Sequence, residues 1–342
     1  MSDLPLISVI IPVFHTAPQI LSRCLESVSA QSDDIRLECI IVFDGQPSSD
    51  LQKVVSHCEL GLMRVETIAH AGVSCARNKG LSVASGEWIC FLDADDRLST
   101  HGLRVLTQYG ADHRCQIIQG GYRTVLATSS EVHRFATTES LLVGDAILTF
   151  RRAVLQPDSG ASAVWSKLFR RSFLCQNTIS FNERLRLGED TLFVFQASTR
   201  AAAIGCVPEI VYEYIRSSKS AVRSFKDSYP ADVEDSMCAM NHQVRSNPDA
   251  DLFRDAFERY VLFHALLVQM HFVFNDQAPW QEQQRRARYR ELTHNREVSR
   301  YLTWKNIFSF PVPKAISLIA LKFTFYRLSR AISNVRRRQL SQ

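Results

Sequence analysis

The sequence lacks the features that mark a membrane-spanning or secreted chain. No uncharged apolar run approaches the roughly 20 residues of a membrane-spanning helix, and residues 1–5 show no signal-type start. The nine cysteines include no Cys-x-x-Cys pair, and several lie inside apolar runs. This usage favours buried, reduced thiols over a zinc site or a disulfide framework. We therefore expect a protein that is made and kept in the cytoplasm.

The two common phosphate-binding loops are also missing. The first apolar run, residues 6–13, leads into Phe14 and His15 instead of the glycines of a dinucleotide-binding turn. No Gly-Lys-Ser or Gly-Lys-Thr of a P-loop occurs anywhere. Any binding of phosphate groups must then depend on a metal ion.

What is present is an alternating α/β pattern. The 342 residues, 46% of them hydrophobic, suffice for about two domains. Buried strands are expected at residues 6–13 and 37–43 and further strands at 62–68 and 88–92, with helices between them. This order predicts an α/β fold, with a mostly parallel sheet and helices on both faces, over residues 1–225. A helical region is expected over residues 226–342, and a helix within the first domain at residues 163–175.

An acidic segment follows the fourth expected strand. Residues 91–96 read Phe-Leu-Asp-Ala-Asp-Asp, which puts three carboxylates at the carboxyl end of a strand, where α/β sheets bind ligands. Carboxylates this close repel one another unless a positive group lies between them. Mg²⁺ and Mn²⁺ favour oxygen ligands and bind one or two carboxylates plus substrate phosphates. The alternative is a solvated turn that caps the next helix; the missing phosphate loops favour the metal–phosphate site.

Five segments then occur in a recognisable order. They are ISVIIPVF (residues 7–14), ECIIVFDG (38–45), GVSCARNKG (72–80), GEWICFLDADD (86–96) and GEDTLF (188–193). Together they resemble the family-two, inverting glycosyltransferases of GT-A fold, of the bacterial cell-surface polysaccharide type, over roughly residues 6–220. The Gln-x-x-Arg-Trp motif of processive synthases is missing. The resemblance therefore implies addition of a single sugar, not chain polymerisation.

The resemblance assigns the donor side of a site. It implies that Asp44 holds the base or ribose of a nucleotide, that Asp93 contacts the nucleotide sugar, and that Asp95 coordinates a Mn²⁺ or Mg²⁺ ion on the diphosphate. Arg77 would neutralise or position the nucleotide. Phe14 stands where the family usually has a tyrosine and is the aromatic member of the substrate-binding set. The identity of the nucleotide is left open by this substitution.

The acceptor side follows from the fifth segment. The resemblance implies that Asp190 is the catalytic base and that Glu189 contacts or orients the acceptor. The residue pattern alone favours another role, since Asp is a common N-cap residue of helices. A helix N-terminus favours the ionised carboxylate, whereas the neighbouring Glu189 raises its pKa by repulsion.

The implied reaction moves one sugar from a nucleotide-diphosphate donor to an acceptor hydroxyl, with inversion. The acceptor would be a glycan or lipid-linked glycan in lipopolysaccharide, capsule or other surface polysaccharide assembly. Two alternatives remain. A nucleotidyltransferase would typically carry a glycine-rich basic loop after its first strand, and a non-catalytic sugar-nucleotide-binding protein would be expected to lose Asp95 or Asp190.

The C-terminal segment has an unusual charge pattern. Residues 301–342 contain no Asp or Glu but eight Lys or Arg residues. Apolar residues from Leu318 to Val335 follow helical spacing, which suits the surface of an anionic bilayer. Packing of this stripe on the protein itself is equally compatible with the pattern. The resemblance favours a peripheral position at the inner face of the cell membrane, and the broad aliphatic face argues against nucleic acid.

Overall fold

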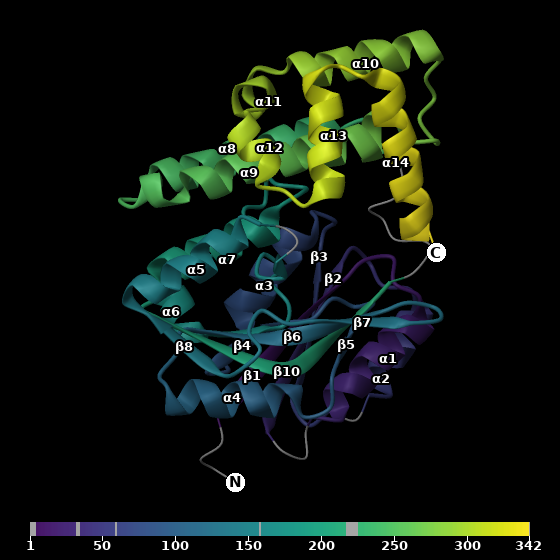
Figure 1. The fold of residues 1–342 in the computed structure, drawn as a ribbon. Coiled ribbons are helices and arrows are strands. Elements are labelled where there is room, and N and C mark those ends of the chain that lie inside the picture. The colour runs from purple at the N-terminus through teal and green to yellow at the C-terminus, as the bar shows by residue number, and fades with distance from the viewer. Residues whose placement is uncertain (1–4, 32–34, 59, 157–158, 217–224, 342) are drawn as a thin grey trace. The chain divides into compact units, whose positions relative to one another are not determined.

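The computed structural model describes residues 5–31, 35–58, 60–156, 159–216 and 225–341 (Figure 1). The chain divides into two compact units. The first comprises Met1–Val154 and Asp158–Ser217, and the second comprises Leu155–Pro157 and Ser218–Gln342.

In the described part of the first unit, the strands form one ten-stranded sheet. Its strand order is β3-β2-β1-β4-β9-β6-β10-β5, with β7 paired to β6 and β8 paired to β10. The strands are β1 (Leu6–Val13), β2 (Arg36–Asp44), β3 (Met63–Ile68), β4 (Trp88–Phe91), β5 (Arg97–Leu98), β6 (Ile117–Val125), β7 (Ser130–His133), β8 (Ser140–Val143), β9 (Lys167–Arg170) and β10 (Ala203–Ile215). Strands β3, β2, β1 and β4 run parallel to one another, as the apolar runs predict. Strand β9 then pairs antiparallel with both β4 and β6. The predicted α/β class is confirmed, and the sheet beyond β4 is mixed.

Helices cover both faces of this sheet. They are α1 (Pro18–Ser29), α2 (Ser49–Ser56), α3 (Val73–Val83), α4 (Gly102–Asp112), α5 (Ile147–Val154), α6 (Arg171–Gln176) and α7 (Glu189–Arg200). Side chains alternate along β1. Val9 and Ile11 therefore share a core cluster with α1 and α4, while Ile10 points to α3. A Cβ on Gly80 of α3 would lie 2.4 Å from Cγ2 of Ile10, so glycine allows the closest approach of this helix to the sheet.

The helix predicted at residues 163–175 is wrong in its first half. Residues 167–170 form β9, and only residues 171–176 are helical, as α6. Phe169 is fully buried, paired with Ile89 on one side and Ile117 on the other. Sheet pairing across two neighbours outweighs the weak local helix preference of this segment.

The second unit is helical, as the sequence predicts. It contains α8 (Tyr229–Arg245), α9 (Ala250–Val268), a π-helical turn (Gln269–Val273), α10 (Glu282–His294), α11 (Arg296–Tyr301), α12 (Trp304–Phe308), α13 (Val312–Lys322) and α14 (Tyr326–Ser341). Phe253, Tyr260, Phe274 and Leu318 are among its fully or almost fully buried side chains. Among the described residues, no helix is both long and apolar enough to span a bilayer.

Candidate active site

The carboxylate of Asp44 organises the turn that follows β3. It lies at the end of β2 and is almost completely buried. Its two oxygens accept hydrogen bonds from the backbone N–H groups of Ala71 (2.7 Å) and Gly72 (3.0 Å). Nδ1 of His70 lies 2.9 Å from the same carboxylate. Asp44 therefore fixes the position of the His70 ring at the edge of the sheet.

An exposed aromatic surface lies beside Asp44. The Phe14 ring, directly after β1, is 48% exposed and stacks on the His70 imidazole, with centroids 4.2 Å apart and planes 7° apart. An exposed π-face suits stacking with a planar base. In the sequence His70 is a lone loop histidine. Its position at the end of a strand is the only feature of the sequence that indicates a functional role, because its partners Asp44 and Phe14 lie 26 and 56 residues upstream.

The three acids of the loop after β4 have different environments. Asp96 is buried and accepts hydrogen bonds from the Tyr212 hydroxyl (2.7 Å) and the backbone N–H of Ile215 (2.7 Å). It thereby attaches the loop to β10. Asp93 is half-buried and bonded to an arginine, whereas Asp95 is exposed. The predicted acidic cluster thus separates into one structural, one bridging and one solvent-facing carboxylate.

Arg77 joins the two halves of the predicted site. This buried residue of α3 donates from Nη2 to Oδ1 of Asp93 (2.8 Å) and from Nη1 to Oδ1 of Asp190 (2.6 Å). Nη1 also lies 3.4 Å from Oε1 of Glu189. The three carboxylates raise the pKa of Arg77 against the opposing effect of burial, so the guanidinium stays charged. The structure therefore brings Asp93 of the fourth sequence segment and Asp190 of the fifth onto one cation, Arg77 of the third.

Asp190 lies in the first turn of α7 but is not its N-cap. The capping position is occupied by Gly188, with φ +74°. Burial raises the pKa of Asp190, and Glu189 and Asp93 act in the same direction, while the Arg77 guanidinium opposes them. A carboxylate of raised pKa is a stronger base than an ordinary surface aspartate.

A fully buried lysine supports the loop beside Asp190. The ammonium of Lys167, in β9, donates to the carbonyl oxygen of Ala163, and the N–H of Val164 donates to the Asp190 carboxylate. These two groups belong to one peptide unit, so this unit connects the lysine to the acid. Burial lowers the pKa of Lys167 to about 7. Lys167 is fully buried because β9 is an interior strand, paired with β4 on one side and β6 on the other.

Candidate metal ligands are few in this unit. Among the described residues, no group of three or more His, Cys, Asp or Glu side chains is arranged to hold a metal ion. In the acidic loop, Asp93 is bonded to Arg77 and Asp96 to Tyr212, which leaves the exposed Asp95 as the acid oriented to solvent. A single carboxylate suits Mg²⁺ or Mn²⁺ only when substrate phosphates supply further oxygens.

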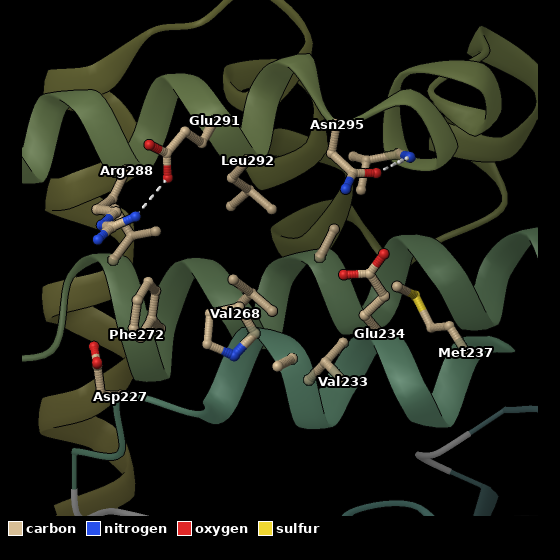
Figure 2. Close-up of a pocket in the computed structure, with 15 residues that line it drawn as sticks. Asp227, Val233, Glu234, Met237, Val268, Phe272, Arg288, Glu291, Leu292 and Asn295 are labelled. Carbon is tan, nitrogen blue, oxygen red and sulfur yellow. Dashed lines mark hydrogen bonds and ion pairs between the residues drawn. The ribbon is translucent and has the colours of Figure 1, made fainter. Parts of the chain in front are cut away.

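The second unit contains a separate pocket that the sequence did not predict (Figure 2). It has a volume of about 340 Å³ and is lined only by residues between Asp227 and Val298. Its wall includes Val268, directly before the π-helical turn, and Phe272 within it, and Arg288 pairs with Glu291 at 3.0 Å. It shares no residue with the site around Arg77.

Comparison with known proteins agrees with this fold and motif order. Residues 8–173 match the family model "Glycosyl transferase family 2". The "Uncharacterized glycosyltransferase EpsJ" of Bacillus subtilis (strain 168) is 27% identical over 226 residues, which are 64% of this chain and 63% of that protein. The "Succinoglycan biosynthesis protein ExoO" of Rhizobium meliloti (strain 1021) is 25% identical, over 63% of this chain and 61% of that protein. The chain thus matches less than two thirds of the length of these relatives.

Solved structures show the same fold. The crystal structure of S. aureus TarS residues 1–349 in complex with UDP-GlcNAc superposes with a TM-score of 0.70, over 97% of this chain and 92% of that chain, at 16% sequence identity. Both the predicted GT-A fold and the resemblance are confirmed. The chain is thus similar to glycosyl transferase family 2 over residues 8–173, a little under half of its length, and shares the fold of TarS.

Proposed function

We propose that this protein is an inverting glycosyltransferase that adds one sugar from a nucleotide-diphosphate donor to an acceptor hydroxyl in surface polysaccharide assembly. The observation that carries the proposal is the pairing of Arg77 with both Asp93 and Asp190. Because both acids accept hydrogen bonds from one guanidinium, they lie close together, and in this proposal the donor-side Asp93 and the half-buried Asp190 would face the two sides of one sugar ring.

The donor side suits a nucleotide. The stacked rings of Phe14 and His70 offer a flat, exposed face for the base, and Asp44 holds His70 in place. TarS, which shares the fold, has been crystallised with UDP and with UDP-GlcNAc. A uridine diphosphate sugar is therefore the first donor class to test.

A divalent cation, Mn²⁺ or Mg²⁺, would be held by Asp95 together with the donor diphosphate. The exposed single carboxylate fits an ion that takes most of its ligands from substrate phosphates and water. When bound, such an ion neutralises negative charge on the departing diphosphate.

The protein's own groups supply the remaining chemistry. Asp190 accepts the proton of the acceptor hydroxyl as its oxygen bonds to the anomeric carbon, while the bond from that carbon to the diphosphate oxygen breaks. Attack from the face opposite the leaving group inverts the anomeric centre, as in one-step glycosidases that use a carboxylate base. Glu189, the neighbour of Asp190 and 3.4 Å from Arg77, would contact or orient the acceptor.

The acceptor is a glycan or a lipid-linked glycan. Support comes from two relatives, one named as a poly(ribitol-phosphate) beta-glucosyltransferase and the other as a succinoglycan biosynthesis protein. Lipopolysaccharide and capsule are included in this class. Lipid-linked acceptors would place the enzyme at the inner face of the cell membrane, attached peripherally.

The test is release of nucleoside diphosphate from a panel of donor sugars with Mn²⁺ or Mg²⁺ and candidate acceptors. We expect release to depend on the acceptor and to fall about 10²- to 10⁴-fold in Asp190→Asn, which keeps the shape but removes the proton acceptor. Near-normal turnover in that variant would remove Asp190 as the base. Release of inorganic pyrophosphate instead would favour a nucleotidyltransferase, and donor binding without turnover would favour a binding protein.

A further inference from the structure

The last helices of the second unit carry an exposed cluster of aromatic rings. Trp304 and Phe308 lie in α12, and Phe323 and Phe325 lie between α13 and α14. Ring centroids are 5.6 Å apart for Trp304–Phe308, 6.0 Å for Trp304–Phe323 and 5.7 Å for Phe323–Phe325. Each of the four side chains is between 47% and 69% exposed. These contacts make one continuous apolar area, here called the aromatic surface.

One side of α13 extends this surface. Val312, Ile316 and Phe323 are spaced by four and seven residues, so they lie on the same side of the helix axis, and all three are exposed. Leu318 and Leu321 lie on the other side and are fully buried. Contiguous exposed apolar areas are uncommon on soluble monomers and mark interaction sites.

The aromatic surface differs from the stripe that the sequence pattern predicts. That stripe, Leu318 to Val335, was expected to be one helical face. The structure breaks it at Thr324, where φ is +55°, and makes α13 and α14 two separate helices (Figure 1). The apolar residues at the start of the stripe pack inward, and the exposed rings come from α12 and from the break itself.

The charge around the aromatic surface is positive. The Lys322 ammonium lies 5.8 Å from the centroid of the Trp304 ring, and Arg327 is exposed two residues after Phe325. The whole segment from residue 301 contributes eight basic residues and no acid. Acids from elsewhere in the unit, Asp255 and Glu282, pair with Lys305 and Arg330.

We propose that the aromatic surface is the membrane-contact site of this protein and inserts into the headgroup region of an anionic bilayer. Trp favours the membrane–water interface, Phe joins Trp and Leu in the apolar faces that enter the headgroup–acyl boundary, and each Lys or Arg near an anionic surface adds attraction. Phe and Trp rings backed by cations match that environment better than the polar rim of a typical protein partner. The inference rests on the peripheral membrane position proposed above, and it does not depend on transferase chemistry.

Vesicle flotation of the full chain tests this assignment. The probes are vesicles of zwitterionic phosphatidylcholine and vesicles that also contain anionic phosphatidylglycerol. We expect the wild type to float with the anionic vesicles at low salt, and the double variant Trp304→Ser/Phe323→Ser to partition roughly tenfold to a hundredfold more weakly. Arg327→Gln should weaken binding about fivefold on the anionic vesicles.

Matched variants keep the result interpretable. Leu252→Ser, at an exposed apolar position in α9 of the same unit, should bind like the wild type. A second pair at the most exposed positions, Phe308→Ser/Val312→Ser, should lose binding while the unfolding midpoint in urea stays at the wild-type value.

Three outcomes would overturn the assignment. The first is no flotation of the wild type with anionic vesicles, and the second is unchanged flotation of both double variants. The third is a vesicle-independent dimer that both double variants dissociate, which would make the surface an interface between two copies of the chain. Nucleoside diphosphate release with a water-soluble acceptor is measured in parallel, so a failure of membrane binding is distinguished from a failure of the proposed reaction.

Discussion

Arg77 neutralises three acids in a partly closed space. Its two terminal nitrogens lie 2.6 Å from Asp190, 2.8 Å from Asp93 and 3.4 Å from Glu189. Arginine suits this position because its planar fork donates in several fixed directions, which a lysine ammonium does not. The same contacts that keep the site assembled also set the charge state of the proposed base.

Replacing Arg77 with methionine is expected to lower both stability and activity. The change keeps much of the side-chain volume but leaves three half-buried carboxylates without their counter-charge, which costs up to about 3–5 kcal/mol. Urea unfolding followed by circular dichroism measures the effect. Lys53→Met is the control, because its ion pair with Asp50 is exposed and should be worth under about 1 kcal/mol. A loss below about 1 kcal/mol in Arg77→Met would show that the acids do not depend on this cation.

Lys167 is expected to act on the pH dependence through Asp190. The base works only when ionised, so the rate falls as the pH drops through its pKa, and burial places this fall above the usual range of an aspartate. Lys167→Met removes a nearby positive charge and the hydrogen bond to Ala163 that holds the Val164 N–H toward Asp190. Both changes disfavour the ionised carboxylate, so the acidic limb of kcat/KM should move to higher pH.

The pH profile of kcat/KM, measured with constant ionic strength, checks this shift. Lys53→Met should leave the limb in place, since Lys53 is exposed on α2. A purely structural role for Lys167 would lower the rate at every pH without moving the limb. An unmoved limb in Lys167→Met would therefore contradict the connection through the 163–164 peptide.

At the level of elements, the sequence predicted where strands lie along the chain better than it predicted which strands pair with each other. The Val- and Ile-rich runs of β1 and β2 are buried on both faces, and such runs have few other stable environments. The short strand β9 was missed because four residues carry little periodic signal, and its burial depends on β4 and β6 from distant parts of the chain. The contact of Phe14 with His70 was not predictable either, because the two residues lie far apart in the sequence. The ends of the two strands that they follow were predicted.

The approach of α3 to β1 gives a prediction at this scale. Gly80→Ala adds a Cβ 2.4 Å from Ile10 Cγ2, on a central and fully buried strand, where an overpacked site costs about 1–3 kcal/mol. This cost opposes the gain in helix propensity of up to about 1 kcal/mol. We expect a lower melting temperature and lower transferase activity, because α3 also carries Arg77.

Gly61→Ala is the matched control for this helix contact. A Cβ at Gly61 would meet no atom within 4 Å, so the melting temperature should stay within about 2 °C of the wild type. If Gly80→Ala were as stable as the wild type, the space between α3 and β1 would be less restrictive than the structure shows.

For the whole molecule, the central question is how the donor and the cation depend on each other. The described residues offer no complete set of metal ligands, and Asp95 is the solvent-facing acid of its loop. In our proposal the diphosphate oxygens supply most of the ion's ligands, and the ion neutralises the diphosphate. Neither the ion nor the nucleotide should therefore bind tightly alone. The motif in the sequence singles out Asp95 as a candidate metal ligand, and that remains a prediction. The separate contacts of Asp93 and Asp96 could not be predicted, because Arg77 and Tyr212 reach them only in the folded chain.

Thermal unfolding with UDP and Mn²⁺ tests this dependence. Ligand at about 100 times its dissociation constant stabilises by about 2.7 kcal/mol, which corresponds to a rise of roughly 5–10 °C in the melting temperature of a unit of this size. We expect this rise only when both are present, its loss on adding EDTA, and its return with excess Mg²⁺ or Mn²⁺. Asp95→Asn should lose most of it, whereas Asp50→Asn, on the exposed surface of α2, should keep it. An equal rise with UDP in EDTA would mean that Arg77 and the stacked rings of Phe14 and His70 bind the nucleotide without a cation. The proposed role of Asp95 would then be abandoned.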